Sequence, residues 1–440
     1  MASGSRPLQR VSIDLTPLLP GGDNGGAKVV ALALVEQFAR LAPDVAFTLL
    51  TSAVSHDELA ALDAPNVSRR CVDADLVGPD DGREARGGAR QAARVVIDTF
   101  VPPAARGQLK DTIWRFVKRT RRARLAHALP SDLHFCPFTA PFYFDPAVPL
   151  VSLVHDLQYL AYPEFFTAEQ RAGRHAHFTD AAQRAARLIC VSEFVRQDVL
   201  ARADLPPERV QTIHSSLLHA SRAPADAEAT ASAVRGRLGL GGRRYLLYPA
   251  NPWPHKNHPR LIDAFAAYLR RWPDSDLGLV CTGAPGAAAT GVIDLARAHL
   301  APGRFAFAGY LPEDEFAALL RGARALIFPS LYEGFGLPLL EAMASAVPVL
   351  CSNTTSLPEV AGEAALLFDP TDTKQIVAAI EHLEHEPALA ATLVAAGRTR
   401  LAAFGSARDM AARYLDAFEV VVVEHARAGA RSLRHPHGSR

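Results

Sequence analysis

Lysine and cysteine are scarce in this chain of 440 residues, and neither sign of charge is in excess. Lys and Arg together number 47 against 46 Asp and Glu, so the formal net charge is +1. This balance argues against a dedicated nucleic-acid-binding protein, because such proteins usually carry a clear basic excess. Nucleic acid is therefore not an expected partner.

The few cysteines are widely spaced and form no C-x-x-C pair. Disulfide frameworks and zinc motifs both place cysteines at short, regular intervals. The spacing thus predicts free thiols in a reducing compartment, with no disulfide and no zinc site. The cysteines are Cys71, Cys136, Cys190, Cys281 and Cys351.

Long hydrophobic runs are also missing. No stretch reaches the roughly 18 consecutive apolar residues that a membrane-spanning helix requires. The N-terminal residues MASGSRPLQRVSIDL lack the apolar segment of a secretory signal peptide. We therefore expect a cytoplasmic protein without a transmembrane helix.

Short apolar runs of strand length alternate with helical patterns along most of the chain. Continuous apolar runs are typical of strands buried on both faces, as in a parallel sheet covered by helices. Their repeated alternation with helices predicts a doubly wound α/β architecture. The apolar runs lie at 11–15, 47–52, 149–156, 187–193, 244–251, 277–283, 324–330 and 347–352, and the helical patterns at 27–41, 168–186, 195–202, 259–271, 313–322 and 373–386.

A stretch rich in Ala, Ser, Pro and Gly at 219–242 precedes a new strand and divides the chain into two α/β halves. The polar, Gly- and Arg-rich segment 72–110 has little periodicity, and we interpret it as a long insertion in the first half. The predicted organisation is a domain at 1–220, a second domain at 241–405, a helix at 406–426 and a disordered tail at 427–440.

The most informative pattern lies at 324–370. A buried strand ends at Ser330, a turn with two glycines follows at 333–336, and Pro338 occupies a position favoured in the first turn of a helix. The free backbone N–H groups at such a helix start bind phosphate readily. Glu333 and Glu341 flank this start, and two carboxylates would repel a phosphate. They are better explained as acceptors for neutral sugar hydroxyls.

The pair Glu333-x7-Glu341 within FPSLYEGFGLPLLEAMASAVPV closely resembles the signature of retaining glycosyltransferase family 4. YPANPWPHKNHPRLIDAFAAY at 248–268 resembles the family's phosphate-binding strand and turn. FAGYLPEDEFAALLRGARALIFPS at 307–330 resembles the family's base-binding loop and the helix that follows it. VHDLQYL at 154–160 and ICVSEF at 189–194 resemble the family's sites in the N-terminal domain. The resemblance implies the GT-B fold, in which two Rossmann-like doubly wound domains face each other across a cleft and the C-terminal domain binds the donor.

The resemblance assigns a role to each residue of the motif. Glu333 would accept hydrogen bonds from the ring hydroxyls of the donor sugar, and Glu341 would hold the ribose hydroxyls of the nucleotide. Backbone groups would complete the donor site: those of Phe335, Gly336 and Leu337 for phosphate and sugar, and those of Tyr310 and Leu311 for the base.

Lys256 is implied to neutralise the donor diphosphate, whose negative charge grows as it leaves. A compact ammonium suits this task, and it stands out in a chain that otherwise uses Arg. The family commonly places an Arg shortly before this Lys, where the present sequence has Ala250 and Asn251. Asn251 is predicted to be a donor-binding residue. Either His255 or an Arg from elsewhere in the chain would supply the second phosphate cation.

Two further sites lie in the first half. His155 follows the apolar run PLVSLV, at the end of a strand where open α/β sheets form their ligand crevice. The resemblance places it beside the donor sugar, whereas Asp156 either caps the following turn or contacts substrate. Gly25 and Gly26 fit neither a dinucleotide-binding nor a Walker motif. They are implied to form a close-approach loop facing the donor phosphates, with a plain flexible turn as the alternative.

The segment 111–129 carries six basic residues around Trp114. A cationic segment with an aromatic anchor is able to bind an anionic bilayer. A solvated basic helix explains the same pattern, and both interpretations stay open. Membrane binding would place the protein peripherally at the inner face of the membrane.

The resemblance implies a retaining hexosyltransferase that uses a nucleotide diphosphate sugar, with mannose or another hexose as the sugar. The expected acceptor is a saccharide or a lipid-linked saccharide, in cell-surface polysaccharide or glycolipid synthesis. No metal or other cofactor is expected. One alternative is a catalytically inactive sugar-nucleotide-binding scaffold of the same fold. Another is a phosphorylase or epimerase of similar architecture. The pyridoxal-phosphate lysine of a phosphorylase would have to be Lys256 or Lys374.

Overall fold

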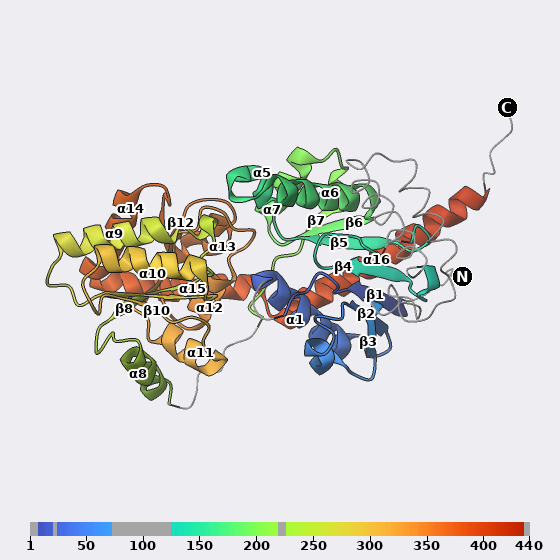
Figure 1. Ribbon diagram of the computed structural model, residues 1–440. Helices are drawn as coiled ribbons and strands as arrows, with labels where there is room; N and C mark the ends of the chain where they lie inside the picture. The colour runs from blue at the N-terminus through green and yellow to red at the C-terminus, as the bar shows by residue number, and fades with distance from the viewer. Residues whose placement is uncertain are drawn as a thin grey trace, which may run out of the picture.

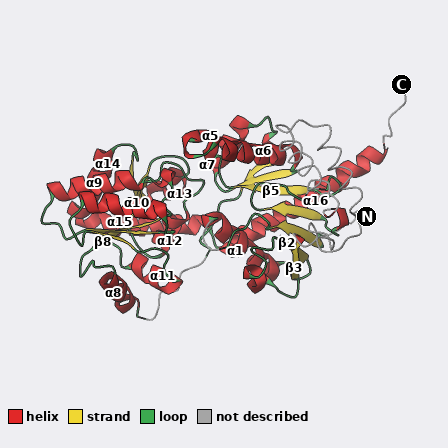
Figure 2. Cartoon of the chain, in the orientation of Figure 1, coloured by secondary structure: helices red, strands yellow, loops and turns green. Residues whose placement is uncertain are grey.

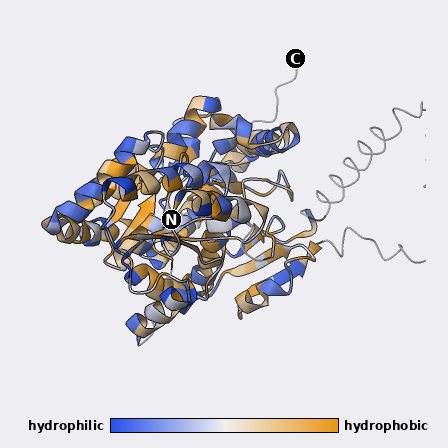
Figure 3. Ribbon diagram, turned by 60° about the vertical axis from the view of Figure 1, so that its left-hand side comes forward, coloured by the Kyte–Doolittle hydropathy of each residue, from blue (hydrophilic) through white to orange (hydrophobic). Residues whose placement is uncertain are grey.

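The computed structural model describes residues 8–20, 24–72, 125, 127–143, 145–218 and 226–434, with side chains up to residue 428. The described chain forms two α/β units side by side, each built on a parallel sheet with helices on both sides (Figures 1 and 2). This architecture confirms the predicted GT-B fold class. The strands are mostly apolar and the covering helices mix apolar and polar residues, as Figure 3 shows.

The first unit contains a seven-stranded sheet with the order β3-β2-β1-β4-β5-β6-β7. Strand β5 is buried at every position, as expected for a strand covered on both faces. The strands are β1 (Arg10–Asp14), β2 (Ala46–Thr51), β3 (Val67–Cys71), β4 (Leu133–Cys136), β5 (Leu150–Val154), β6 (Arg187–Cys190) and β7 (Val210–Thr212); the helices are α1 (Gly25–Leu41), α5 (Gln158–Ala161), α6 (Ala168–Arg184) and α7 (Glu193–Arg202).

The second unit contains a six-stranded sheet with the order β10-β9-β8-β11-β12-β13. Its strands are β8 (Tyr245–Pro249), β9 (Gly278–Thr282), β10 (Phe305–Phe307), β11 (Ala325–Phe328), β12 (Val349–Ser352) and β13 (Ala365–Phe368). Its helices are α8 (Ala227–Arg237), α9 (His258–Arg271), α10 (Ala287–His299), α11 (Glu313–Arg321), α12 (Leu337–Ala344), α13 (Leu357–Ala361), α14 (Thr373–His385) and α15 (Pro387–Phe404).

The predicted boundary at 219–242 contains a helix. Helix α8 packs against α11 of the second unit. The second unit therefore includes residues that precede position 241, where the sequence places its start.

The last helix, α16 (Ala407–Arg434), leaves the second unit and runs back along the first (Figure 1). Its Phe418 ring lies 5.6 Å from the ring of Phe38 on α1 and 5.2 Å from that of Phe135 on β4. The prediction of disorder from residue 427 is wrong for 427–434, which continue α16. Ala, Arg and Leu favour helix even where no apolar face requires it.

Parts of two predictions fall outside the described residues. These are nearly all of the insertion at 72–110 and most of the basic segment at 111–129. In the described part of the chain, no helix combines the length and the apolar character needed to cross a bilayer.

Candidate functional site

A cavity of about 930 Å³ lies between the two units, at the carboxyl ends of their strands. Both units contribute to its lining, as the loops after β5 and β8 and the start of α12 show. All thirteen residues that the sequence analysis assigns to catalysis or donor binding line this cavity, as does Asp156. They are Gly25, Gly26, His155, Asn251, His255, Lys256, Tyr310, Leu311, Glu333, Phe335, Gly336, Leu337 and Glu341.

Lys256 and Glu333 form an ion pair in the cavity, with Nζ and Oε1 2.5 Å apart. Both side chains are largely buried, with 12% and 13% of their surface exposed. The Lys256 ammonium also lies 5.4 Å from the centre of the Phe328 ring. Each charge therefore has a partner in the cavity, and each also keeps hydrogen-bonding capacity beyond this single contact.

The backbone around Lys256 is fixed by the second sheet. The hydroxyl of Tyr248, on β8, donates a 2.6 Å hydrogen bond to the carbonyl of Lys256. The next residue, Asn257, has φ of 61° and donates from Nδ2 to the carbonyls of Pro329 and Pro370. This left-handed turn ends the short 3₁₀ segment and starts α9, which directs the lysine side chain toward the cavity.

The loop that carries Glu333 is held by hydroxyl groups from the segment before α13. The backbone N–H of Glu333 donates to Thr355 Oγ1, and Ser356 Oγ lies 3.0 Å from the carbonyls of both Glu333 and Phe335. Gly336 adopts φ of 103° as α12 begins, a conformation that favours glycine. The start of α12 borders the cavity, and a helix start is a position where an anion is stabilised.

Glu341 lies on α12 and borders the cavity. Burial raises the pKa of its carboxyl group from 4.5 to about 7. A carboxyl with such a pKa is poised to ionise when a ligand supplies hydrogen-bond donors, because those donors stabilise the charged form. The position suits a group that accepts hydrogen bonds from hydroxyls.

Two histidines border the cavity in neutral form. His155 Nε2 donates a 2.8 Å hydrogen bond to the Pro137 carbonyl, so Nδ1 keeps its lone pair, and burial lowers the pKa of the ring. The pKa of His255 is lowered to about 4 by burial and by the charge of Lys256. His255 is therefore a poor second cation in the ligand-free cavity.

Asp156 and Asn251 organise the neighbouring loops. Asp156 Oδ1 accepts a 3.0 Å hydrogen bond from the N–H of Gln158 and so caps the turn after β5, while the residue also borders the cavity. Asn251 Oδ1 accepts from the N–H of Ala284 and from the Tyr310 hydroxyl. The exposed Tyr310 ring is thereby held at the edge of the cavity.

Arg174 and Trp253 also line the cavity and were missed by the sequence analysis. Arg174, on α6, lies with its guanidinium carbon 5.0 Å from the centre of the Phe166 ring. Trp253 packs close to Gly25, where an added Cβ would lie 3.3 Å from the tryptophan ring. Arg174 belongs to no motif and reaches the site through the packing of the first unit on the second. Trp253 lies within the segment 248–268, where the sequence analysis gave it no role.

Several polar contacts hold the two units together beside the cavity. Ser192 Oγ, at the start of α7, donates a 2.7 Å hydrogen bond to the carbonyl of Gly334. Glu359, on α13, accepts from the N–H groups of Glu193 and Phe194 and pairs with His214. The loop that carries Glu333 is thus fastened to the first unit.

Comparison with known proteins gives two family matches. Residues 24–216 match the model described as Glycosyltransferase Family 4, and residues 233–400 match the model described as Glycosyl transferases group 1. Together the two matches cover both α/β units and most of the cavity lining.

Curated relatives include the Escherichia coli O-antigen chain mannosyltransferase B, 31% identical over 236 residues, which are 52% of this chain and 60% of that protein. The MMP alpha-(1->4)-mannosyltransferase of Mycolicibacterium hassiacum is 30% identical over 258 residues, 56% of this chain and 57% of the relative. The matched region thus spans no more than about 60% of the length of these relatives.

Solved structures share the fold at low identity. HepE from Anabaena, crystallised with UDP and glucose, has a TM-score of 0.67 and 15% identity, with 94% of this chain and 100% of that chain covered. WaaG, described as a glycosyltransferase involved in lipopolysaccharide biosynthesis, has a TM-score of 0.60 and 15% identity, with 93% and 99% covered. These likenesses confirm the two-unit fold.

Proposed function

This chain belongs to the family 4 glycosyltransferases, and on that premise we propose that it transfers a hexosyl group from a nucleotide diphosphate sugar to a saccharide hydroxyl. Mannose is the favoured sugar, because mannosyltransferases recur among the curated relatives. The name of the Escherichia coli relative refers to the O-antigen chain, which favours a role in cell-surface polysaccharide synthesis.

The Lys256–Glu333 ion pair is the observation that carries this proposal. A donor that enters the cavity would bring a diphosphate for the ammonium and hydroxyl groups for the carboxylate. Each charged group would exchange its present partner for a part of the donor. Both new contacts are favourable, because the Lys256 ammonium would bind the anionic diphosphate and the Glu333 carboxylate would accept hydrogen bonds from neutral hydroxyl groups.

We propose that the reaction proceeds with retention and without a metal. The bond from the anomeric carbon to the phosphate oxygen breaks, the acceptor oxygen attacks from the same face, and its proton moves to the leaving phosphate. Lys256 and the N–H groups at the start of α12 would stabilise the charge that develops on that phosphate. His155, held by Pro137, would orient the donor sugar.

Arg174 is proposed as the second phosphate cation. Among the charged lining residues that the structure describes, only Arg174 and Lys256 are basic besides the two histidines. The charge of Arg174 also contributes to lowering the pKa of His255, which places the guanidinium within electrostatic range of the Lys256 turn. The cation that the family usually supplies from the second unit would here come from the first.

The acceptor is proposed to be a saccharide, carried on a lipid or free, that enters from the first unit. Contact of segment 111–129 with an anionic bilayer at the inner face of the membrane belongs to the same proposal. Replacement of Arg119, Arg121, Arg122 and Arg124 by Gln should release the protein from anionic liposomes. Wild-type protein that fails to sediment with such liposomes even at low ionic strength would exclude membrane contact.

Transfer assays with labelled nucleotide sugars test the proposed activity. We expect transfer or slow donor hydrolysis with one sugar nucleotide, GDP-mannose being the first to try. The Lys256→Ala variant should lose turnover by at least about 100-fold, because the charge on the leaving diphosphate is larger in the transition state than in the bound donor.

Lys374→Ala is the matched control, since this other lysine of the second unit is exposed on α14, away from the cavity. Its turnover should equal that of the wild type. Nucleotide-sugar binding without any transfer or hydrolysis would favour the inactive-scaffold alternative. Absorbance from bound pyridoxal phosphate would favour a phosphorylase.

A further inference from the structure

Three buried side chains meet where the strand order of the first sheet reverses. The chain runs outward from β1 through β2 to β3 and then returns to the other side of β1 as β4. Asp14 is the last residue of β1 and Cys136 the last residue of β4, and His134 lies two positions earlier on the same face of β4. Such a reversal point is where open α/β sheets form ligand crevices.

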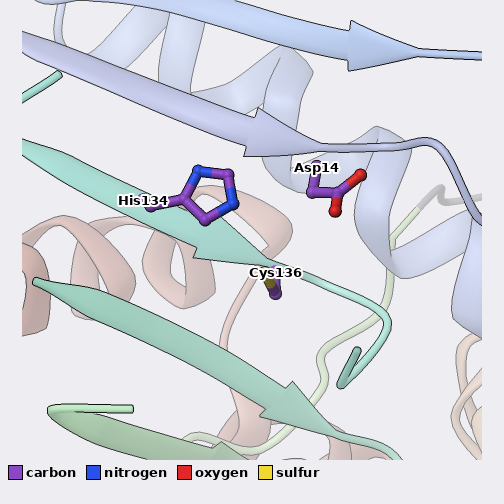
Figure 4. A group of neighbouring side chains, drawn as sticks. All are labelled: Asp14, His134 and Cys136. Carbon is purple, nitrogen blue, oxygen red and sulfur yellow. The ribbon is translucent and has the colours of Figure 1, made fainter. Parts of the chain in front are cut away.

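The side chains of Asp14, His134 and Cys136 converge at this point, as Figure 4 shows. One ligand atom from each residue lies within 4.8 Å of the other two. All three residues are at most 5% exposed. None of them lines the proposed donor cavity, so the cluster is a separate feature of the first unit.

Only one of the two ring nitrogens of His134 has a hydrogen-bond partner in the described structure. Nδ1 lies 2.7 Å from the hydroxyl of Ser12 on the neighbouring strand. Nε2 is buried and has no hydrogen-bond partner in the described structure. A buried polar atom without a partner is costly, and such atoms are few in folded proteins. This nitrogen therefore indicates a ligand that supplies the missing interaction.

We propose that Asp14, His134 and Cys136 bind one Zn²⁺ ion. Thiolate, imidazole and carboxylate are all established zinc ligands, with bond lengths of about 2.0–2.3 Å. Small side-chain rotations bring atoms that lie within 4.8 Å of one another to these distances. Coordination forms a Zn–S bond as the Cys136 thiol releases its proton to solvent.

Charge balance and the surrounding hydrogen bonds favour zinc at this position. A dication with one thiolate, one carboxylate and a neutral imidazole has no net charge, which suits a site without solvent. With zinc on Nε2, the Ser12 hydroxyl, 2.7 Å from Nδ1, would accept a hydrogen bond from Nδ1–H and so orient the ring. Thr16 donates to Asp14 Oδ1 from both its N–H and its hydroxyl, which orients the carboxylate.

The proposed zinc site would fasten β1 to β4 across the point where the sheet reverses. β1 leads directly into the loop before α1, whose first residues Gly25 and Gly26 line the cavity. The metal would act as a structural tie for that loop, and the proposed transfer reaction needs no metal chemistry from it. Failure of this inference therefore leaves the proposed function untouched.

Metal analysis of the full chain, purified without chelator from zinc-supplemented cells, tests the site. We expect about one equivalent of zinc per chain in the wild type and at least a fivefold lower content in the Cys136→Ala and His134→Ala variants. Cys281→Ala is the matched control, because it removes an equally buried thiol from β9. Its zinc content should equal that of the wild type.

Cys136→Ala also separates this site from zinc bound by other residues, such as His435 and His437. Zinc that remains undiminished in Cys136→Ala, or a wild type without zinc, would overturn the proposal. If a variant does not fold, protein produced with cobalt gives a second readout on the wild type. Thiolate-to-cobalt charge-transfer absorption is expected there, and its absence would contradict a Cys136 ligand.

Discussion

Glu341 shows at the scale of one residue how a binding site reduces stability. Its raised pKa means that the folded protein holds a proton more tightly than the unfolded chain, so stability falls as the pH rises from 4.5 to about 7 and then levels off. Such a shift corresponds to at most about 3.4 kcal/mol, and partial exposure reduces this to about 1–2 kcal/mol.

Glu341→Gln should therefore unfold at higher denaturant concentration than the wild type at pH 8, and equally at pH 4. The same variant should bind nucleotide diphosphate more weakly at pH 8, by about 1.5–3 kcal/mol, because it lacks the charged acceptor for the ribose hydroxyls. Calorimetry that finds unchanged affinity would refute the ribose assignment. A stability difference that does not vary with pH would contradict the raised pKa.

Arg174 offers a test of the second phosphate cation. Arg174→Ala should weaken the binding of nucleoside diphosphate about tenfold and leave nucleoside binding unchanged, because only the phosphates lose a partner. The control is Arg171→Ala, one turn earlier on α6, which is exposed and does not line the cavity. Equal affinities in the two variants would mean that the phosphates are held without Arg174.

The motif residues could be predicted, and Arg174 could not, for a physical reason. Glu333 lies in the turn before α12, and Glu341 lies on α12 itself. The local sequence therefore determines where both carboxylates stand relative to the start of this helix. Arg174 reaches the cavity only when the first unit packs on the second. The Asp14, His134 and Cys136 cluster likewise depends on pairing between strands that are more than 100 residues apart in the chain.

At the scale of elements, strands that lie within a continuous apolar run were predictable, and β4 and β10 were not. The run at 149–156 contains β5 and that at 277–283 contains β9, because both are buried over five residues. β10 has three residues, which is too short for a pattern, and β4 includes the polar His134. Only their pairing with neighbouring strands identifies them.

Helices α7 and α13 form the main polar contact between the two units. Glu359 accepts hydrogen bonds of 2.7 and 2.9 Å from the first N–H groups of α7, where the helix dipole favours a negative charge. Its Oε1 also lies 2.7 Å from His214 Nε2. Burial raises the pKa of Glu359, but the hydrogen bonds from His214 and α7 lower it overall. This contact is therefore formed at neutral pH and is lost as the pH falls below 4.5 through the lowered pKa.

Glu359→Ala should loosen the two units and lower turnover about tenfold, with the melting temperature reduced by a few degrees. Glu363→Ala is the control, since Glu363 is exposed just beyond α13. Small-angle scattering should detect a larger radius of gyration in Glu359→Ala alone. Identical scattering and turnover in both variants would show that the contact does not hold the units together.

At the scale of the whole molecule, the cavity exists because the Glu333 loop touches the first unit. Gly334 is the closest point of this approach: a Cβ added there would lie 1.9 Å from the carbonyl oxygen of His155. The neighbouring contact from Ser192 to the Gly334 carbonyl requires the same approach. Glycine at position 334, which has no side chain, thus allows the close approach that brings His155 and Glu333 into one site.

Gly334→Ala should keep both units folded but hold them apart, because the obstructing atom belongs to backbone and cannot rotate away. Nucleoside affinity should stay within about twofold, since Asn251 and Glu341 belong to the second unit, while nucleoside diphosphate should bind up to about tenfold more weakly because Arg174 moves away with the first unit. Turnover should fall by at least about 100-fold through misplacement of the reacting groups. Gly291→Ala, on α10 with open space around it, is the control and should match the wild type in both measurements.

Normal turnover in Gly334→Ala, measured beside calorimetry and scattering on the same samples, would show that catalysis does not need the close approach of the Glu333 loop to the first unit. Loss of nucleoside binding together with turnover would instead place the damage within the second unit.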